Sequence, residues 1–531
     1  MGTGPAPEEA RPSTAPTNIA RTDAHAWRWR VGVVAFAFVF HLTSLGFGFL
    51  EWDDPLHVSR NNLVVAPQTR TWTEHLTTPA LGYPIPVTVL TYRAEAAAFG
   101  VEQAWPFHLT NVLLAAGCVL LALEIGVLLG LSRAGAALAA LFFALHPVAA
   151  EPIAWISGRK DLLALLLGLI ALWLAWPVEH VATPRNATVR RWAAVFCFAV
   201  ALLAKPTIAP LPALVLLAHA CYAPAFRSDP FRRKAMRLVR LGLPYLAVLV
   251  PIAYLGVVGQ RAQGAVGDDG QQGASYLRSL WYAAGHHVDL LFFLEEPTAK
   301  YLPSPWPPVF SPRVDLAPVA LLALAAFAIH RLRGPLGRAA LFGSVWAALT
   351  YAPSSGLIPL TRYLADSYVF EPLLGVAWML GAVFDSAWAQ ATPRSRRLYA
   401  GAAAVAMALV GALWVVSAAR FHDDEALWAH ARARFPESAR VCRMWANGVA
   451  KVRGPAPGLV ATDTCIEQFG DGLFVKNRGL LLAQVGRLGE AQTWLLRAQA
   501  LSPADATVKT YLDGVTRAIA ARRGAPQAPK P

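Results

Sequence analysis

Residues 31–50, VGVVAFAFVFHLTSLGFGFL, contain no Asp, Glu, Lys or Arg. A helix of this length can cross the hydrocarbon core of a bilayer, because each residue adds 1.5 Å. Similar apolar runs of about 17–25 residues recur along the chain. The chain is 56% hydrophobic and 15% charged, with a mean hydropathy of +0.41, whereas a soluble protein carries charges nearer a quarter of its length. The sequence therefore predicts an all-α, multi-pass membrane helical bundle.

Basic residues indicate how the bundle is oriented. The net charge of +14 could suggest nucleic acid binding, but most Lys and Arg residues cluster in short segments between apolar runs. These clusters are 28–30, Arg133, 185–191, 227–237, 331–338 and 394–397. Loops rich in Lys and Arg stay on the cytoplasmic side. The charge is therefore mainly a topology signal, and we expect no nucleic acid partner.

The positions of the apolar runs predict about eleven spans. They are 31–50, 107–129, 135–156, 161–177, 192–204, 207–222, 241–258, 315–330, 339–352, 368–387 and 399–417. With the basic loops inside, this number places the N-terminus in the cytoplasm and the C-terminus outside. The stretch 276–295 is also apolar, but it contains His286, His287 and Asp289, which are costly in mid-bilayer. A twelfth crossing would also move the basic loop 330–338 outside, so we expect an interfacial or re-entrant helix there.

Composition divides the chain into parts. Residues 1–27 are rich in Pro, Ala and Thr and read as a disordered N-terminal tail. The transmembrane domain is predicted at 28–419, with a long first outer loop at 51–106. Helical periodicity replaces long apolar runs at 420–515, and residues 516–531 are expected to be a disordered tail.

The segment 420–515 shows features of tetratricopeptide repeats. Small residues and a terminal proline fall at that repeat's spacing in 478–503, at Gly479, Gly486, Ala491, Ala498 and Pro503. A degenerate helix pair precedes it, with Pro436 at the turn. About three repeats are needed to bury a continuous core, so this unit must dock on something; a plain helical cap is the alternative. Cys442 and Cys465 lie in this exported segment, where a disulfide is permitted, although sequence separation does not establish one.

Charged residues converge at the outer face. Asp53 and Asp54 directly follow the first span, and the segment LHPVAAEPIAWISGRKDLL, 145–163, brings acids and cations to one membrane edge. The full candidate set comprises Asp53 and Asp54 as catalytic acids; Arg93, Arg159, Lys160, Lys205 and Arg362 as phosphate-binding cations; and His146, Glu151, Asp161 and Tyr368 as supporting residues. Burying so many polar groups at a membrane edge is expensive without a function.

These residue types suit one chemistry. A carboxylate at the membrane surface can act as general base on an acceptor hydroxyl, and cations can hold a lipid-linked phosphate as the leaving group. Together they suit glycosyl transfer from a polyprenyl-phosphate sugar. For each group a structural alternative stays open: Asp53 and Asp54 as a solvated loop start or helix cap, Arg159 and Lys160 snorkelling to lipid phosphates, and Lys205 as a helix C-cap.

Several of these stretches occur in the order of a known family. EWDD (51–54), VTVLTYR (87–93), HPVAAEPIAWISGRKDLL (146–163), LLAKPTIAPLP (202–212) and ADSYVFEPLLG (365–375) precede the tetratricopeptide-like helices. The whole resembles the transmembrane and tetratricopeptide-repeat (TMTC) protein O-mannosyltransferases and their bacterial relatives, over about residues 30–510. The 146–163 block is the most specific part of the resemblance.

The resemblance implies a GT-C membrane glycosyltransferase fold, a polyprenyl-phosphate sugar as donor, and Ser or Thr hydroxyls of exported proteins as acceptors. Another envelope acceptor is the alternative for an enzyme of this kind. It assigns catalysis to an acidic residue of the first outer loop, here Asp53 or Asp54. Some GT-C enzymes use a divalent metal at this site and others do not, so the cofactor stays open. The family usually has Arg at the position of Ser367, and Arg362 could substitute for it.

Two other functions remain as alternatives. A non-catalytic membrane scaffold would use the C-terminal helices to recruit a partner, with the acidic pair serving structure alone. A transporter would line both halves of a midplane path with polar groups, whereas these residues gather on one face. The expected location is the cell (inner) membrane, with the C-terminal helical domain extracytoplasmic.

Overall fold

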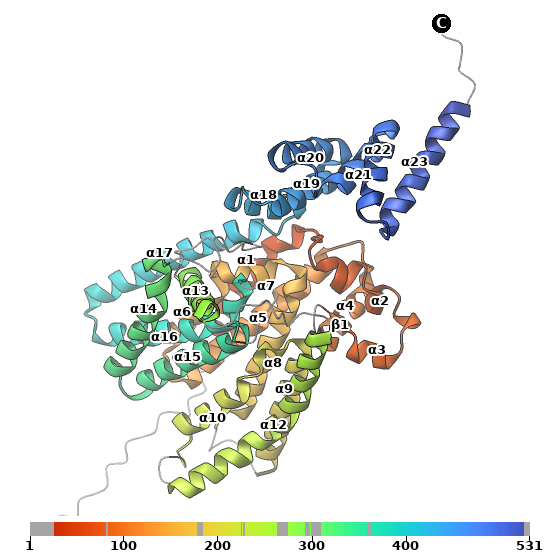
Figure 1. The fold of residues 1–531 in the computed structure, drawn as a ribbon. Helices are drawn as coiled ribbons and strands as arrows, with labels where there is room; N and C mark the ends of the chain where they lie inside the picture. The colour runs from red at the N-terminus through yellow and green to blue at the C-terminus, as the bar shows by residue number, and fades with distance from the viewer. Residues whose placement is uncertain are drawn as a thin grey trace, which may run out of the picture.

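The computed structural model describes residues 26–80, 83–177, 184–224, 226, 229–262, 274–292, 298, 310–357 and 364–524. It shows an all-α bundle with a smaller group of C-terminal helices packed on one end, and a single two-stranded ribbon among these residues (Figure 1). The predicted fold class, an all-α multi-pass membrane bundle, is confirmed. The predicted tail 1–27 lies outside the described residues except for its last two, which begin α1.

The bundle consists of long helices joined by short connections. Its helices are α1 (Ala26–His41), α5 (Trp105–Leu128), α6 (Arg133–Leu145), α7 (Ala150–Ala154), α8 (Arg159–Ala175), α9 (Pro184–Ala204), α10 (Leu211–Tyr222), α12 (Phe231–Ala262), α13 (Ala274–Leu291), α14 (Pro312–Arg331), α15 (Gly334–Tyr351), α16 (Phe370–Gln390) and α17 (Pro393–Ala419). Short 3-10 turns connect some of them: η1 (Leu42–Gly46), η4 (Pro147–Ala149), η5 (Ile156–Gly158), η6 (Pro206–Ile208), η7 (Ala352–Ser354) and η8 (Asp366–Val369).

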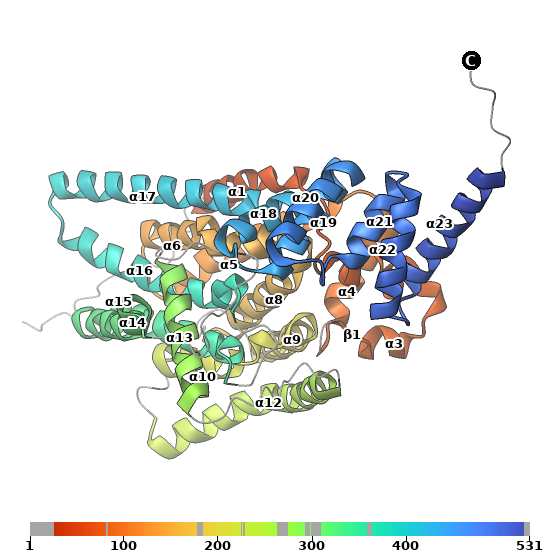
Figure 2. The same cartoon turned by 45° about the horizontal axis from the view of Figure 1, so that its top comes forward.

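Each expected span coincides with a helix or a broken helix. Among the described residues, seven helices are long and apolar enough to cross a membrane, and the pair α6 and α7, bent by 55° at Pro147, makes an eighth. The expected spans at α8, α10 and α15 are shorter or less apolar than these. Figure 2 shows α13 running across the direction of α17 and α1, which is the orientation expected of an interfacial helix.

Small residues allow a close contact between α15 and α16. A Cβ on Gly343 of α15 would lie 2.5 Å from the Gly375 carbonyl oxygen of α16, and a Cβ on Gly375 would lie 2.3 Å from the Gly343 oxygen. Without these side chains the two backbones touch, as is common between helices in membranes. The fully buried rings of Trp346 and Trp378 pack edge-to-face beside this contact, with centroids 5.2 Å apart.

The first loop is folded rather than a free linker. It contains the π turn η2 (Pro55–Ser59), α2 (Asn62–Val65), the 3-10 turn η3 (Pro67–Thr69), α3 (Trp72–Thr77), β1 (Pro79–Ala80), β2 (Tyr83–Pro84) and α4 (Pro86–Phe99). Thr71 and Glu74 form a reciprocal capping box that starts α3. The apolar stretch 85–93 forms α4, whose Val89 and Tyr92 are buried against Phe107 of α5.

The C-terminal segment is a series of antiparallel helices: α18 (Asp424–Arg434), α19 (Ala439–Arg453), α20 (Pro455–Phe469), α21 (Val475–Gln484), α22 (Leu488–Leu501) and α23 (Ala506–Gly524). Pro436 lies in the predicted turn, between α18 and α19. Gly479 lets α21 close on Leu495 of α22, since a Cβ there would lie 3.0 Å from the Leu495 side chain. A disulfide joins Cys442 of α19 to Cys465 of α20. The last helix runs to Gly524, past the expected domain end at 515.

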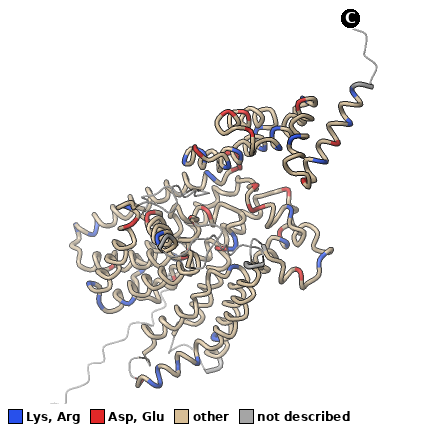
Figure 3. The backbone as a smooth tube through the Cα atoms, in the orientation of Figure 1, with Lys and Arg blue, Asp and Glu red and all other residues tan. Residues whose placement is uncertain are grey.

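Charge is distributed unevenly over these parts. Figure 3 shows mostly uncharged residues along the middle of the bundle, with charged residues on the C-terminal helices and near helix ends. This distribution is expected when helix middles face hydrocarbon and helix ends face water.

Candidate functional site

The two acids of the first loop have different environments. Asp54 is completely buried, and its Oδ1 accepts hydrogen bonds from the Ser157 backbone N–H (3.0 Å) and the Ser157 hydroxyl. Its Oδ2 accepts from the Leu50 N–H at 2.8 Å. Burial raises the pKa of Asp54 to about 6, and these three hydrogen bonds oppose a larger shift. Asp54 thus fastens the first loop to the turn before α8.

Asp53 is the more accessible acid. Its side chain is half-buried, and among the described residues no donor lies within hydrogen-bonding distance of its carboxylate. Asp53 interacts electrostatically with Lys160. Asp53 is therefore the acid of the pair whose oxygens remain available to a substrate hydroxyl.

The turn before α8 places Lys160 beside this acid. Lys160 Nζ donates to the Ser157 carbonyl at 2.8 Å and lies 5.1 Å from the centre of the Trp155 ring. The turn requires Gly158, because a Cβ there would lie 2.7 Å from Pro152 Cα. Lys160 is half-buried. It also interacts electrostatically with Asp161, Glu151 and Lys205.

A buried ion pair lies next to Lys160. Lys205, between α9 and η6, contacts Asp161 of α8, and both side chains are almost fully buried. Glu371 at the start of α16 accepts a hydrogen bond from the Thr207 hydroxyl at 2.6 Å. Burial raises the pKa of the nearby Tyr83 in the first loop to about 12. The first loop, the start of α8, the end of α9 and the start of α16 therefore meet around one polar cluster. Its members are Lys160, Asp161, Lys205, Glu371 and Tyr83.

Three of the predicted supporting residues, Glu151, Tyr368 and His146, contact other protein groups. The Ser367 hydroxyl donates to Glu151 Oε1 at 3.0 Å, so Ser367, where the TMTC resemblance leads one to expect Arg, binds a carboxylate directly. The Tyr368 ring packs on His287 with centroids 5.9 Å apart. His146 caps η4 by accepting the Val148 N–H, and its Nε2 lies 3.1 Å from the Leu291 carbonyl.

The two candidate arginines of the first-loop region bind protein groups. Arg159 has no exposed surface; its guanidinium donates to Asn111 Oδ1 (2.9 Å) and to the Phe107 carbonyl (2.7 Å), and pairs with Glu95. Arg93 reaches His75 at 3.1 Å and lies over the Trp72 ring. Arg159 is thus held inside the protein by these contacts. Arg362 lies outside the described residues.

The C-terminal helices close over the start of the first loop. Lys451 Nζ donates to the Phe49 carbonyl at 3.1 Å and to Asp424 Oδ2 at 2.6 Å, and Asp424 Oδ1 accepts the Glu51 N–H at 2.7 Å. Burial raises the pKa of Asp424. The Trp52 ring stacks on Trp155 with centroids 4.8 Å apart. The backbone that leads into Asp53 is therefore held from two sides.

The acidic pair does not fit a two-carboxylate metal site. Both oxygens of Asp54 already accept N–H groups, which a cation would have to displace. Within the described residues no group of three or more His, Cys, Asp or Glu side chains is positioned to hold a metal ion.

An apolar groove approaches the cluster from the side of α13. The groove, about 230 Å³ in volume, is lined by α13, α14, α15 and α16, with residues such as Leu291, Leu321 and Met379. His287 and Tyr351 form a polar pair in its wall, with Nδ1 2.9 Å from the phenol oxygen. His287 also contacts Tyr368, so the groove leads toward the polar cluster.

Comparison with known proteins gives two kinds of relative. No protein-family model matches the chain. A segment is 31% identical over 189 residues to the protein O-mannosyl-transferase Tmtc2 of Drosophila melanogaster, which is 33% of this chain and 19% of that protein. Another match is 32% identical over 136 residues to human TMTC4, 23% of this chain and 18% of that protein. The chain resembles the TMTC proteins. These matches span less than a fifth of the length of those relatives.

Solved structures of ArnT from Cupriavidus metallidurans are also similar. The form bound to undecaprenyl phosphate has a TM-score of 0.43 at 19% identity, and the apo form 0.41 at 18%. Each comparison covers 92% of this chain and 85% of ArnT.

Sequence reasoning missed several polar members of the site. Three of them are Ser157, Thr207 and Glu371, which bind or lie next to the candidate residues. Each is a single polar residue in an apolar stretch, so its residue type alone gave no signal. Glu371 could have been found, since it lies in the ADSYVFEPLLG stretch that carries the TMTC resemblance. Tyr83 sits in a loop segment with no periodic signal, and only the fold brings it to Lys205.

Proposed function

We propose that the chain is a membrane glycosyltransferase that moves a sugar, mannose by its TMTC resemblance, from a polyprenyl-phosphate carrier to a Ser or Thr hydroxyl of an exported protein or to another envelope acceptor. The observation that carries the proposal is the position of Asp53: half-buried, free of hydrogen-bond donors among the described residues, and electrostatically coupled to Lys160. A carboxylate with open oxygens beside a cation is what transfer from a phosphate leaving group requires.

Asp53 is the general base in this proposal. As the acceptor oxygen forms its bond to the sugar C1, the C1–O bond to phosphate breaks, the acceptor proton passes to Asp53, and the polyprenyl phosphate leaves with the electron pair. Asp54 does not contact the acceptor. Its hydrogen bonds to Leu50 and Ser157 hold the loop that carries Asp53.

Lys160 and Lys205 are the proposed phosphate-binding cations. Lys160 is half-buried beside Asp53, and Lys205 forms the buried pair with Asp161. A phosphate approaching Lys160 would be stabilised as negative charge develops on the leaving group. We assign Arg159 and Arg93 to positioning the first loop, because their donors bind protein groups.

The apolar groove between α13 and α16 suits the lipid part of the donor. Its lining is mainly aliphatic, and its polar pair, His287 and Tyr351, lies on the side of Tyr368. A polyprenyl chain in this groove would bring its phosphate toward the cluster, since Val369 of η8 lines the groove and the adjacent Tyr368 packs on His287.

The C-terminal helices belong, in this proposal, on the extracytoplasmic side of the cell membrane, where the acceptor is found. The disulfide between Cys442 and Cys465 supports this side, because disulfides persist in oxidising compartments. We propose that the predicted domain at 420–515, extended to the end of α23 at Gly524, is a tetratricopeptide-like domain that presents the acceptor to the first loop.

The test compares Asp53→Asn, Asp54→Asn and the exposed control Asp513→Asn in cells lacking the native gene. Membrane levels are matched by blotting, and exported glycopeptides and envelope glycans are measured by mass spectrometry. We expect Asp53→Asn to abolish a hexose modification at normal protein abundance, Asp54→Asn to reduce both the modification and the abundance, and Asp513→Asn to behave as wild type. Full modification in Asp53→Asn would refute the assignment of the base.

A scaffold is the second candidate, favoured by the hydrogen bonds that join α18 and α19 to Glu51 and Phe49 at the start of the first loop. It predicts that the deletion strain and Asp53→Asn both retain every hexose modification. Partners captured by the C-terminal helices would then define the function.

A further inference from the structure

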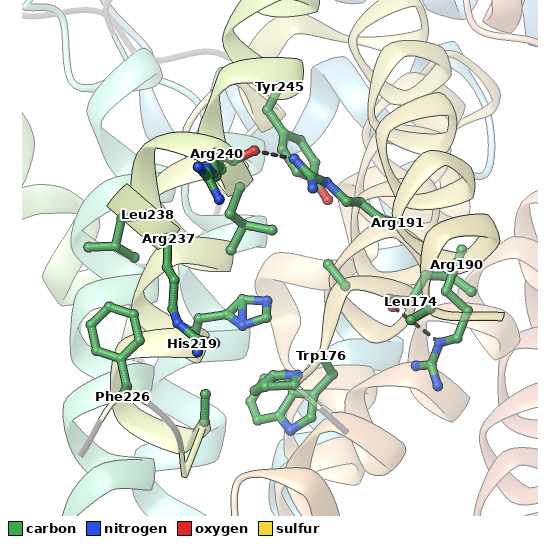
Figure 4. A pocket seen from close by; sticks show the side chains of 15 residues that line it. Leu174, Trp176, Arg190, Arg191, His219, Phe226, Arg237, Leu238, Arg240 and Tyr245 are labelled. Carbon is green, nitrogen blue, oxygen red and sulfur yellow. Dashed lines mark hydrogen bonds between the residues drawn. The ribbon is translucent and has the colours of Figure 1, made fainter. Parts of the chain in front are cut away.

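A basic cavity lies at the opposite end of the bundle from the candidate site. It has a volume of about 410 Å³ and is enclosed by the ends of α8, α9, α10 and α12 (Figure 4). Arg190 lines it on α9, fifteen residues before Lys205. That separation corresponds to about 22 Å along a helix. The cavity is therefore separate from the polar cluster around Asp53.

Four arginines line this cavity: Arg190, Arg191, Arg237 and Arg240. Among the described residues only Arg237 has a carboxylate partner, Asp229 at 2.7 Å. Arg190 donates to the Leu174 and Trp173 carbonyls, and Arg191 donates to the Arg240 carbonyl. Backbone oxygens orient these guanidinium groups without neutralising them, so the cavity keeps an uncompensated positive charge.

A buried hydroxyl in the wall points to a missing acceptor. Tyr245 of α12 is completely buried and lines the cavity, yet its hydroxyl has no hydrogen-bond partner among the described residues. The Nε of Arg191 is likewise buried without a partner. Figure 4 shows Tyr245 and Arg191 together on one side of the cavity. Leaving such donors unsatisfied is costly, and a phosphate oxygen placed between them would accept from both.

Apart from His219, the remaining wall is mainly apolar. Trp176, Leu238 and Leu241 line the cavity. On α12, which lies at the edge of the bundle in Figures 1 and 2, Leu243 and Val250 are exposed, as expected of a lipid-facing helix. A ligand here needs an anionic head and an apolar body. Cytoplasmic topology alone explains basic loop residues, but it does not explain arginines from two helices converging on a cavity with an unsatisfied tyrosine.

We propose that this cavity binds the phosphate of an anionic phospholipid, with its acyl chains against the apolar wall and the outer surface of α12. Arg190, Arg191 and Arg240 supply the charge, and Tyr245 donates one hydrogen bond. Basic pockets between membrane helices are suited to such headgroups. The site lies at the membrane face opposite the proposed transfer reaction and does not depend on that reaction.

The test uses the full chain in detergent and native mass spectrometry. Phosphatidylglycerol, phosphatidylcholine and inorganic phosphate are each titrated into wild type, Arg190→Gln/Arg240→Gln, Tyr245→Phe, and the control Arg394→Gln/Arg397→Gln. The control removes two exposed arginines from the first turns of α17. Size-exclusion chromatography checks that each variant is folded.

We expect one tightly bound phosphatidylglycerol in wild type and in the control, about tenfold weaker binding in the double arginine variant, and a smaller loss in Tyr245→Phe. Phosphatidylcholine, which has no net charge, should bind poorly. Equal phosphatidylglycerol affinity in the two double variants would overturn the proposal. If inorganic phosphate at a comparable concentration displaces the lipid, the cavity is a site for soluble phosphate, and the phospholipid proposal is overturned. If Arg190→Gln/Arg240→Gln does not fold, wild-type affinity in Tyr245→Phe would count against the site.

Discussion

Ser157 donates both its backbone N–H and its hydroxyl to the same oxygen of Asp54, across 103 residues of sequence. This relationship joins the first loop to the turn that carries Lys160. It also separates the roles of the two adjacent acids, because the carboxylate of Asp54 is occupied by these bonds whereas Asp53 keeps its oxygens available.

Ser157→Ala should destabilise the protein without removing the proposed base. The change deletes one of three donors to a buried carboxylate, which we expect to lower the free energy of unfolding by about 1–3 kcal/mol. Denaturant unfolding in detergent measures this loss. The exposed Ser502→Ala is the control and should unfold like wild type. Unchanged stability in Ser157→Ala would show that the bond contributes nothing.

Stability should depend on pH through Asp54. Its pKa is raised to about 6 in the folded protein from 3.8. Folding therefore favours the protonated acid, and this contribution is complete below about pH 3.8 and is lost as pH rises through 6. The total change in the free energy of unfolding from this titration is roughly 3 kcal/mol.

Unfolding of wild type and Asp54→Asn at pH 4.5 and at pH 7.5 tests this dependence. Wild type should lose stability relative to the Asn variant between the two values, because Asn does not titrate. Parallel behaviour of the two proteins would contradict the raised pKa of Asp54.

The Lys205–Asp161 pair allows structure and phosphate binding to be separated. Lys205→Met leaves Asp161 buried without its cation, which should cost about 3–5 kcal/mol of unfolding free energy. Asp161→Asn/Lys205→Met removes both charges and should recover most of that loss.

If Lys205 binds the donor phosphate, the double variant should be stable yet at least about tenfold slower in sugar transfer. Unfolding and glycopeptide formation are measured on the same preparations. Wild-type transfer by the double variant would restrict Lys205 to a structural role.

Lys451 should couple the C-terminal helices to the first loop. Lys451→Met removes its bonds to the Phe49 carbonyl and to Asp424, and we expect a loss of about 1–2 kcal/mol and faster proteolysis of the first loop. Lys476→Met is the matched control, because it breaks an ion pair with Asp505 inside the C-terminal segment. Equal protease sensitivity of the first loop in the two variants would contradict the coupling.

Much of the fold was predictable because the bilayer imposes length and hydropathy on each span. The apolar runs located the helices, and Pro436 and Gly479 indicated two of the C-terminal helix contacts. The site was predictable only as a region. The alternating direction of the predicted spans placed the pair Asp53 and Asp54 at the same membrane edge as the segment 145–163. Counting spans in this way gives no distances between these residues.

The sequence by itself determined the class of protein, the order of its helices and the gathering of acids and cations at one end, because these follow from residue type and spacing along the chain. Only the tertiary structure decided that Asp54 is bonded to Ser157 while Asp53 stays open, that Lys205 is paired with Asp161, and that Arg159 is enclosed by protein groups. Each of these outcomes depends on contacts between residues more than forty positions apart, and local periodicity carries no information about such contacts.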